Sequence, residues 1–264
     1  MSLTASPADP RALAVALLLL AAAAPALAAD PICSVPSGLA ALGAPLPAVA
    51  ALRRAHDEIV IVAFGSSSTQ GAGATRPDRT YPARLEGNLR ILMPESAVRV
   101  HNRGRGGDSI PAMLERLDRD VLSLRPHLVV WQLGVNDVIN VKGVAQLEVP
   151  IREGVRRLRR AGADIVLMDL QHAPRVLADH DAEAMQALLA RIARDEAVGL
   201  FSRFAVMRHW IAVQGIPLRQ AVDPDGLHMT DWSYGCIATA LAGAIARASS
   251  PQRTDPAPRP NPQP

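Results

Sequence analysis

The chain has 264 residues, of which 49% are hydrophobic and 20% are charged, and its formal net charge is +3 at pH 7. The arginines are scattered among acidic residues, and aromatic residues make up only 3% of the chain. Nucleic-acid-binding faces combine a clustered basic stripe with aromatic platforms. The composition therefore argues against nucleic acid as a partner.

The first 28 residues are typical of a secretory signal peptide. Arg11 precedes an apolar run over residues 12–24, and Pro25 leads into the small-residue site Ala26-Leu27-Ala28. The run is shorter than the roughly 20 residues that a membrane span needs, although an uncleaved anchor or a buried core helix is the alternative. We expect a periplasmic or secreted bacterial protein with no stable membrane span after cleavage.

The remaining sequence predicts one domain, since domains typically hold about 100–200 residues. We expect an N-terminal extension over residues 29–57 and the folded domain over residues 58–248. Residues 249–264 are rich in Pro, Arg and polar side chains. Such a segment has too little apolar surface to offset the entropy of ordering it, so we predict a disordered tail.

Short apolar runs alternate with amphipathic stretches along this body. The runs predict strands at residues 58–64, 97–101, 127–133, 164–170 and 199–201. Helices are expected at residues 80–93, from Pro111 onward, and at residues 149–161, 182–197, 204–214 and 231–248, with a glycine-rich turn over residues 102–107. Alternation of this kind predicts an α/β fold, a three-layer α/β/α sandwich around a mostly parallel, flavodoxin-like sheet of about five strands. In such sheets ligands bind beyond the carboxyl ends of the strands.

The chain has two cysteines, Cys33 and Cys236, and both lie after the predicted signal peptide. Export favours a disulfide between them that ties the mature N-terminus to the last helix. Two unpaired buried thiols are the alternative, because the sequence does not show how close the two Cα atoms lie.

The first chemically suggestive segment is Gly65-Ser66-Ser67-Ser68-Thr69, directly after the first strand. A serine in a tight strand-to-helix turn lies near free backbone N–H groups, a position that suits a nucleophile. Taken alone, the turn is equally a helix cap or a phosphate-binding turn. No lysine follows, so it is not a P-loop, and Thr69 stands where a G-x-S-x-G elbow has its second glycine.

Three further segments complete a possible site. Gly104, Gly106 and Gly107 follow the second strand, Gly134-Val135-Asn136-Asp137 follows the third, and Asp225-Gly226-Leu227-His228 precedes the last helix. Glycine N–H groups and the Asn136 amide are possible oxyanion donors, and a carboxylate three residues before a histidine can orient its ring. The ordinary alternatives are simple turns and a surface histidine.

In combination and order, these four segments resemble the SGNH hydrolase superfamily, also called GDSL-type esterases and lipases. The resemblance implies Ser67 as nucleophile, His228 as base and Asp225 as the group that orients it. It also implies an oxyanion hole formed by the N–H groups of Ser67 and Gly107 and by Asn136. The family usually has Asp before the nucleophile, where this chain has Ser66, which makes Ser66 and Ser68 rival nucleophiles.

The implied activity is hydrolysis of esters through an acyl-serine intermediate, with no cofactor and no metal. The absence of a long apolar insertion favours a short acyl group, such as acetyl, on a small-molecule or carbohydrate ester. An O-acyltransferase with the same site and an inactive carbohydrate-binding relic are the competing hypotheses. Three residues, Gln171, His172 and Arg175, lie just past the fourth predicted strand. We therefore expect them to contact the substrate. The sequence does not indicate an oligomeric state.

Overall fold

The computed structural model describes residues 33–140 and 143–250. The predicted signal peptide and residues 251–264 of the predicted tail lie outside this part. Within it, no helix combines the length and the apolar character needed to cross a membrane.

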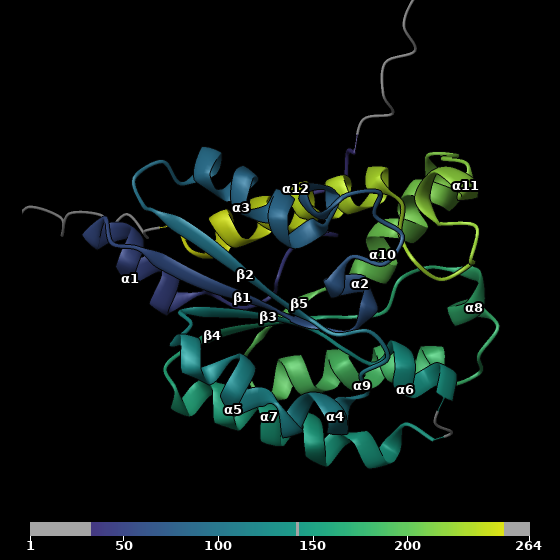
Figure 1. Ribbon diagram of the computed structural model, residues 1–264, viewed down its shortest axis with the longest axis horizontal. Helices are drawn as coiled ribbons and strands as arrows, with labels where there is room; N and C mark the ends of the chain where they lie inside the picture. Colours follow the sequence, from purple (N-terminus) through teal and green to yellow (C-terminus); the bar gives the residue numbers. More distant parts are fainter. Residues whose placement is uncertain (1–32, 141–142, 251–264) are drawn as a thin grey trace, which may run out of the picture. The chain divides into compact units, whose positions relative to one another are not determined.

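A five-stranded parallel sheet forms the centre of the molecule (Figure 1). Its strands are β1 (Ile59–Gly65), β2 (Val98–Gly104), β3 (Leu128–Gln132), β4 (Asp164–Met168) and β5 (Gly199–Phe201). They lie in the order β2-β1-β3-β4-β5, and every neighbouring pair is parallel. This is the order of flavodoxin-like, doubly wound sheets, and the predicted fold class is confirmed.

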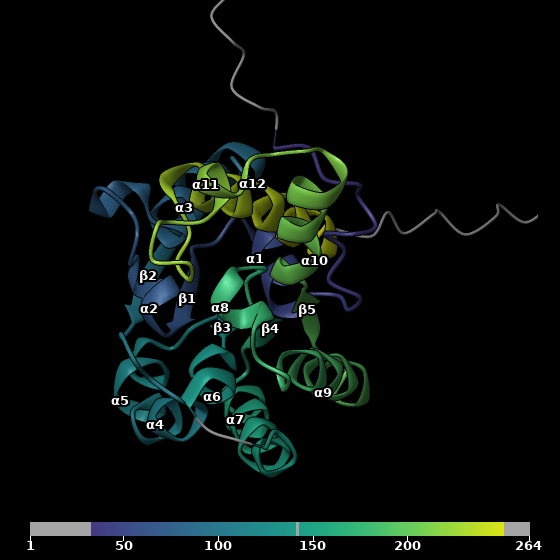
Figure 2. The same ribbon diagram turned by 90° about the vertical axis from the view of Figure 1, so that its right-hand side faces the viewer.

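Helices cover both faces of the sheet, and each face has its own hydrophobic core (Figure 2). One layer contains α1 (Pro47–Ala55), α3 (Tyr81–Leu92), α10 (Arg203–Arg208) and α12 (Asp231–Ala248). The other layer contains α4 (Ile110–Glu115), α5 (Leu117–Asp120), α7 (Glu148–Arg160) and α9 (Ala182–Asp195). Coverage of both faces explains why every residue of β3 is buried.

Short helical segments make up most of the connections. The α-helical ones are α2 (Ser67–Gln70), α6 (Val135–Asn140), α8 (Pro174–Leu177) and α11 (Leu218–Ala221). Three-residue 3₁₀ turns lie at Pro77–Arg79, Leu122–Leu124 and Ala145–Leu147, and a π-helical turn, His209–Val213, continues α10. The helix predicted over residues 204–214 therefore changes its hydrogen-bond pattern halfway.

The second strand is longer than the sequence indicates. Residues 102–104, predicted as part of a turn, belong to β2, and Gly104 pairs with Gly65 at the end of β1. The prediction was wrong here because pairing with a neighbouring strand, and not local composition, holds these residues extended. The consequence is that β1 and β2 end side by side.

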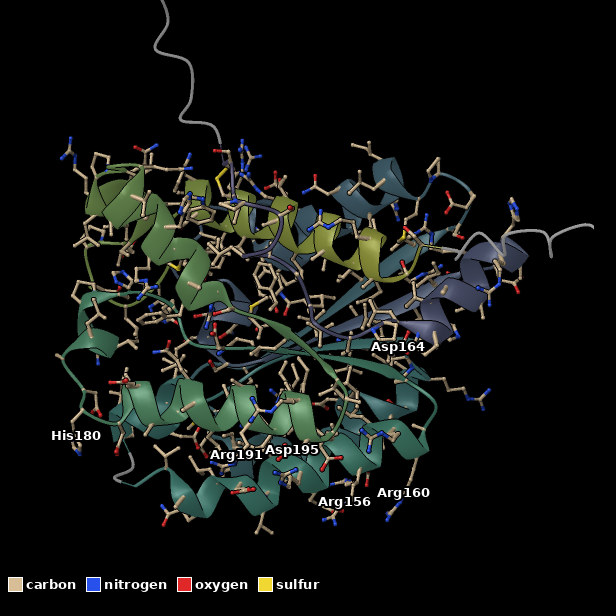
Figure 3. The ribbon with its side chains drawn as sticks, turned by 180° about the vertical axis from the view of Figure 1, so that it is seen from behind. Arg156, Arg160, Asp164, His180, Arg191 and Asp195 are labelled. Atoms are coloured by element: carbon tan, nitrogen blue, oxygen red, sulfur yellow. A yellow bond between two sulfur atoms is a disulfide. The ribbon has the colours of Figure 1, made fainter. Side chains whose placement is uncertain are left out.

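Residues ahead of the predicted start at residue 58 also pack against the sheet. The carboxylate of Asp164, at the start of β4, accepts a hydrogen bond from the Val49 N–H at 2.9 Å (Figure 3). The N–H of Leu46 donates to the carbonyl of Ala248 at 3.0 Å, and the N–H of Leu200 donates to the carbonyl of Leu42 at 2.8 Å. The segment from Leu42 through α1 thus contacts β4, β5 and the end of α12.

The basic face of α7 is largely paired with carboxylates. Arg152 contacts Glu148 on its own helix and Asp195 at the end of α9, at 2.9 and 2.7 Å. Arg191 on α9 reaches back to Glu148 at 2.6 Å (Figure 3). These arginines therefore join two helices.

A disulfide joins Cys33 to Cys236, with the two Cα atoms 5.1 Å apart. The bond closes a loop with a sequence separation of 203 residues, and Cys236 is buried on α12. It therefore fastens the first described residue to the helix that follows the Asp225–His228 segment.

Replacing both cysteines, as Cys33→Ala with Cys236→Ala, is expected to lower the free energy of unfolding by about 2–5 kcal/mol, because the cross-link restricts the unfolded chain. Urea unfolding of both proteins measures the difference. A reducing agent should lower the unfolding free energy of the wild type by a similar amount and leave that of the variant unchanged. Equal unfolding midpoints for both proteins, with and without the reducing agent, would contradict the prediction.

Asp169 is a buried carboxylate at the end of β4 that holds the start of α10. Its two oxygens accept hydrogen bonds from the Phe204 N–H at 2.9 Å and from the Ser202 hydroxyl at 2.7 Å. The adjacent Arg203 guanidinium donates to the main-chain carbonyl of Asp169 instead. Burial outweighs these interactions and raises the pKa of Asp169 to about 6.

A raised pKa means that the folded state holds the proton more tightly than the unfolded state. The stability that this provides is present below the ordinary pKa and is lost as the pH rises through about 6. Between pH 4 and pH 7 the wild type should lose up to about 3 kcal/mol of unfolding free energy relative to Asp169→Asn. Urea unfolding of both proteins across this range tests it, and a pH-independent difference would show that Asp169 stays ionised.

Candidate active site

Ser67 is the first residue of α2, immediately after β1. Its side chain is partly accessible, whereas Ser66 and Ser68 on either side are 2% and 1% exposed. The Ser66 hydroxyl donates to the side-chain carbonyl of Gln132 at 3.2 Å. Of the three serines, Ser67 alone is both accessible and in contact with a base, so the rivals raised by the sequence are poorly placed to attack a substrate.

The segment Asp225–His228 forms a turn that orients the histidine. One oxygen of Asp225 accepts the N–H groups of Leu227 and His228 at 2.8 and 2.9 Å. The other oxygen lies 2.5 Å from Nδ1 of His228. The carboxylate therefore fixes both the backbone of the turn and the imidazole ring.

The opposite ring nitrogen of His228, Nε2, lies 2.8 Å from the hydroxyl oxygen of Ser67. Serine, histidine and aspartate thus form a continuous hydrogen-bonded row in which the aspartate stabilises one tautomer of the ring. The free nitrogen is then the acceptor for the serine proton. This arrangement can activate the Ser67 hydroxyl as a nucleophile.

The pKa of Asp225 supports this role. Burial by itself would raise the pKa, but the hydrogen bonds from the His228 ring and from the N–H groups of His228 and Leu227 outweigh it and hold the pKa below its ordinary value. Asp225 is therefore ionised at neutral pH, so its carboxylate can accept the Nδ1 hydrogen of His228 and hold the ring in one tautomer.

Two contacts bring the histidine turn against the serine. Gly73, three residues after α2, has φ of +86°, and a Cβ there would lie 2.5 Å from the Met229 carbonyl. Only glycine fits such a close approach without strain. In addition, the N–H and hydroxyl of Thr75 donate to Asp231 at 2.9 and 2.5 Å. The loop after α2 is therefore bound to the first turn of α12.

Possible oxyanion donors lie on the turns that follow β2 and β3. Gly107 follows β2, has φ of +81°, and is exposed. The amide nitrogen of Asn136, at the start of α6, donates to the carbonyl of Asp108 at 2.9 Å, which leaves its second hydrogen available. Within residues 33–140 and 143–250, no acceptor takes the N–H of Ser67 or of Gly107.

The loop that carries Gly107 is fastened to both neighbouring turns. The N–H of Gly106 donates to the side-chain carbonyl of Gln70 on α2 at 2.9 Å. The N–H of Ile110 donates to the carboxylate of Asp137, next to Asn136, at 3.0 Å. The three predicted oxyanion donors therefore come from segments that are in direct contact.

The three predicted substrate contacts have different surroundings. Gln171 is fully buried, and its amide donates to the Leu227 carbonyl at 3.1 Å, so it supports the histidine turn from inside. His172 packs edge-on against Phe204, and burial lowers its pKa. Arg175 is exposed, and its N–H donates to the Gly226 carbonyl at 3.0 Å. Of the three, Arg175 has the position best suited to contact a substrate.

Two buried residues in the site were not identified from the sequence. Gln132 ends β3 and accepts hydrogen bonds from the Ser66 N–H and the Thr69 hydroxyl, both at 3.0 Å. Arg116 follows α4 and lies behind the Gly107 loop, with 4% of its surface exposed. For Gln132, a polar residue at the end of an apolar strand is a weak sequence signal. For Arg116, the sequence carries no signal.

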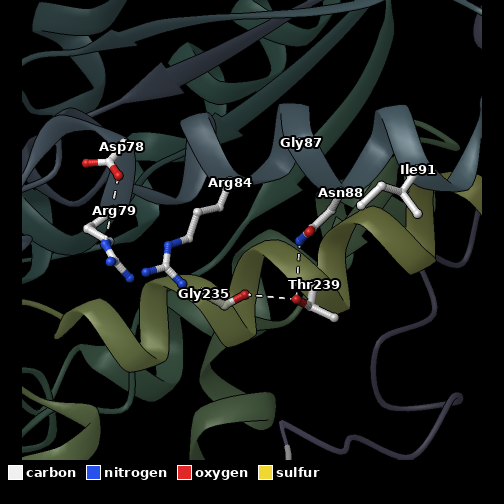
Figure 4. A pocket seen from close by; sticks show the side chains of 8 residues that line it. All are labelled: Asp78, Arg79, Arg84, Gly87, Asn88, Ile91, Gly235 and Thr239. Atoms are coloured by element: carbon white, nitrogen blue, oxygen red, sulfur yellow. Dashed lines mark hydrogen bonds and ion pairs between the residues drawn. The ribbon is translucent and has the colours of Figure 1, made fainter.

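A separate polar hollow of about 340 Å³ lies between α3 and α12 (Figure 4). Arg79 and Arg84 contribute to its lining, and a Cβ on Gly235 would lie 2.2 Å from the Arg84 guanidinium. No residue of the Ser67–His228–Asp225 row lines it. Among the described residues, no group of three His, Cys, Asp or Glu side chains could hold a metal ion.

Several proteins with similar sequence or structure are described as esterases. A segment of 58 residues is 34% identical to an acetylxylan esterase of Geobacillus stearothermophilus, and this match spans 22% of the chain but only 26% of that protein. A two-domain esterase active on acetylated mannans superposes with a TM-score of 0.70 at 20% identity, over 86% of this chain and 61% of the esterase. An acetyl xylan esterase structure from Geobacillus stearothermophilus superposes with a TM-score of 0.59 at 20% identity. The match covers 72% of this chain and 94% of that esterase.

A family model described as the non-GDSL lipase-like family matches residues 32–251. The description agrees with the absence of Gly-Asp-Ser at residues 65–67, where the chain has Gly-Ser-Ser. The GDSL-type class named from the sequence therefore stays a prediction. Because the match spans most of the sequence, the chain belongs to the non-GDSL lipase-like family.

Proposed function

We propose that this protein is an SGNH-type carboxylic ester hydrolase that uses Ser67 as its nucleophile. The observation that carries the proposal is the hydrogen-bonded row from the Ser67 hydroxyl through His228 to Asp225. Membership of a lipase-like family and the fold shared with carbohydrate esterases support the same reaction class. An inactive relic would have no reason to keep all three side chains in contact.

The mechanism follows from the positions of these groups. His228 accepts the Ser67 proton through Nε2 while the serine oxygen attacks the ester carbonyl. The negative oxygen of the tetrahedral intermediate is held by the N–H groups of Ser67 and Gly107 and by the Asn136 amide, each worth about 3–4 kcal/mol. His228 then protonates the leaving alcohol. Water, activated by the same histidine, releases the acyl group from Ser67.

We propose an acetyl ester of a carbohydrate as the substrate class. The proteins with similar folds include esterases described as active on acetylated mannans and on acetyl xylan, and the local sequence match is to an acetylxylan esterase. The sequence lacks a long apolar insertion that would enclose a long acyl chain. A polysaccharide substrate also agrees with the predicted signal peptide, because such substrates lie outside the cytoplasm.

Ser67→Ala and His228→Ala are each expected to lower kcat/KM for p-nitrophenyl acetate by at least about 10³-fold, because the nucleophile or its base is lost. The wild type should release acetate from acetylated xylan or mannan and should hydrolyse p-nitrophenyl octanoate poorly. Acetate release and p-nitrophenol absorbance measure the two activities.

Ser66→Ala is the matched control for this experiment, since Ser66 is adjacent, buried and unable to reach His228. Full activity of Ser67→Ala would show that another group is the nucleophile. Transfer of acetyl to an added alcohol in preference to water would favour the acyltransferase hypothesis, and octanoate hydrolysis equal to that of acetate would remove the short-acyl proposal.

Arg175→Ala should raise KM for acetylated polysaccharide about three- to tenfold and leave p-nitrophenyl acetate unaffected, because an exposed side chain beside the catalytic turn reaches only a large substrate. Gln171→Ala should instead lower kcat for both esters alike, since it removes support from the turn. Michaelis kinetics with the two substrates distinguish these effects. The same change on both substrates for Arg175→Ala would remove its proposed role in substrate binding.

A further inference from the structure

Arg116 has an unusual position for an arginine, because its guanidinium lies inside the protein directly behind the predicted oxyanion donors. Only 4% of the residue is exposed. Its carbon atom Cζ lies 4.5 Å from the centre of the Phe64 ring, next to the end of β1. A buried charge is costly unless its hydrogen-bonding groups are satisfied, so the partners of this guanidinium indicate what it does.

Two of those partners flank the turns that carry the Ser67 and Gly107 N–H groups. Nη2 donates to the Gly65 carbonyl at 2.9 Å, two residues before Ser67. Nε contacts the carboxylate of Asp108 at 2.5 Å, one residue after Gly107. One planar group thus binds the residues that flank both turns, and its fixed fork of donors makes the distance between them rigid.

The third donor is connected to the same group through Asp108. The carbonyl of Asp108 accepts the amide hydrogen of Asn136 at 2.9 Å, while its carboxylate is held by Arg116. Displacement of Asp108 would therefore move Asn136 and Gly107 together. The remaining nitrogen, Nη1, donates to the Arg103 carbonyl on β2 at 3.0 Å and to the carboxylate of Asp120 on α5 at 3.2 Å.

We propose that Arg116 is a positioning residue for the oxyanion-binding groups, which holds the turn after β1 and the turn after β2 at the spacing that a tetrahedral intermediate needs. The inference rests on the proposed function of this site. Arg116 does not touch the substrate. It acts through Asp108 and Gly65, so its loss should weaken binding of the transition state more than binding of the substrate.

The test compares Arg116→Met with Arg116→Lys and with Asp120→Asn, a matched control that neutralises the carboxylate partner on α5, outside the two turns. With p-nitrophenyl acetate, Arg116→Met should lower kcat about 10- to 100-fold, less than loss of a whole donor, and change KM less than about threefold. Arg116→Lys keeps the charge without the fork and should have an intermediate kcat. Asp120→Asn should stay within about twofold of the wild type.

Phenylboronic acid supplies a second measurement, because its tetrahedral adduct on a serine places an oxygen among the same donors. Its inhibition constant should rise in Arg116→Met by about the factor by which kcat falls. The double variant Arg116→Met with Asp108→Asn leaves no unpaired buried charge, so it provides a folded protein if Arg116→Met is unstable. Its kcat should remain low, because restoring charge balance does not restore the spacing.

Three results would overturn the inference. These are a folded Arg116→Met protein with wild-type kcat and boronate affinity, an equal loss in Asp120→Asn, and full recovery of kcat in the double variant. The last two results would show that Arg116 contributes to stability or charge balance and does not position the donors. Failure of the proposed function has a different signature, because the wild type itself would then not hydrolyse the ester.

Discussion

The parallel pairing of β1 with β2 on one side and β3 on the other is the constraint on which the site depends. Because the three strands run in the same direction, their carboxyl ends meet at one edge of the sheet. Ser67, Gly107 and Asn136 each lie a few residues past one of these ends. Neighbouring parallel strands are about 4.8 Å apart, so side chains and N–H groups from separate parts of the chain reach the same small molecule.

Buried polar side chains at this edge hold the turns that follow the strands. Gln132 accepts hydrogen bonds from the turn after β1, Gln171 donates to the carbonyl just before His228, and Arg116 binds the turns after β1 and β2. Each adds a side-chain hydrogen bond to a backbone group of a turn or a strand end. These contacts fix the shapes of the serine turn and the histidine turn, as electrostatic pre-organisation requires.

The histidine reaches the serine from the opposite end of the sequence, through a different kind of support. The Asp225–His228 turn is fixed by Asp225 itself, the loop after α2 contacts it through Gly73, and Thr75 binds Asp231 at the start of α12. The same helix is joined to Cys33 by the disulfide. The helix that follows the histidine turn is therefore also the helix that the disulfide holds.

The sequence by itself determined the strands, the layered α/β architecture and the four segments of the site, because apolar periodicity and turn chemistry are local properties of the chain. Only the tertiary structure decided the extension of β2 through Gly104, the pairing of Cys33 with Cys236, and the packing of α1 against β4, since each depends on a neighbour distant in sequence. It also placed Gln171 inside the protein, although the residue follows a strand end as a substrate contact would. Two partners of Arg116, Asp108 and Gly65, lie 8 and 51 residues away along the chain, so local pattern alone does not distinguish this buried arginine from the exposed ones around it.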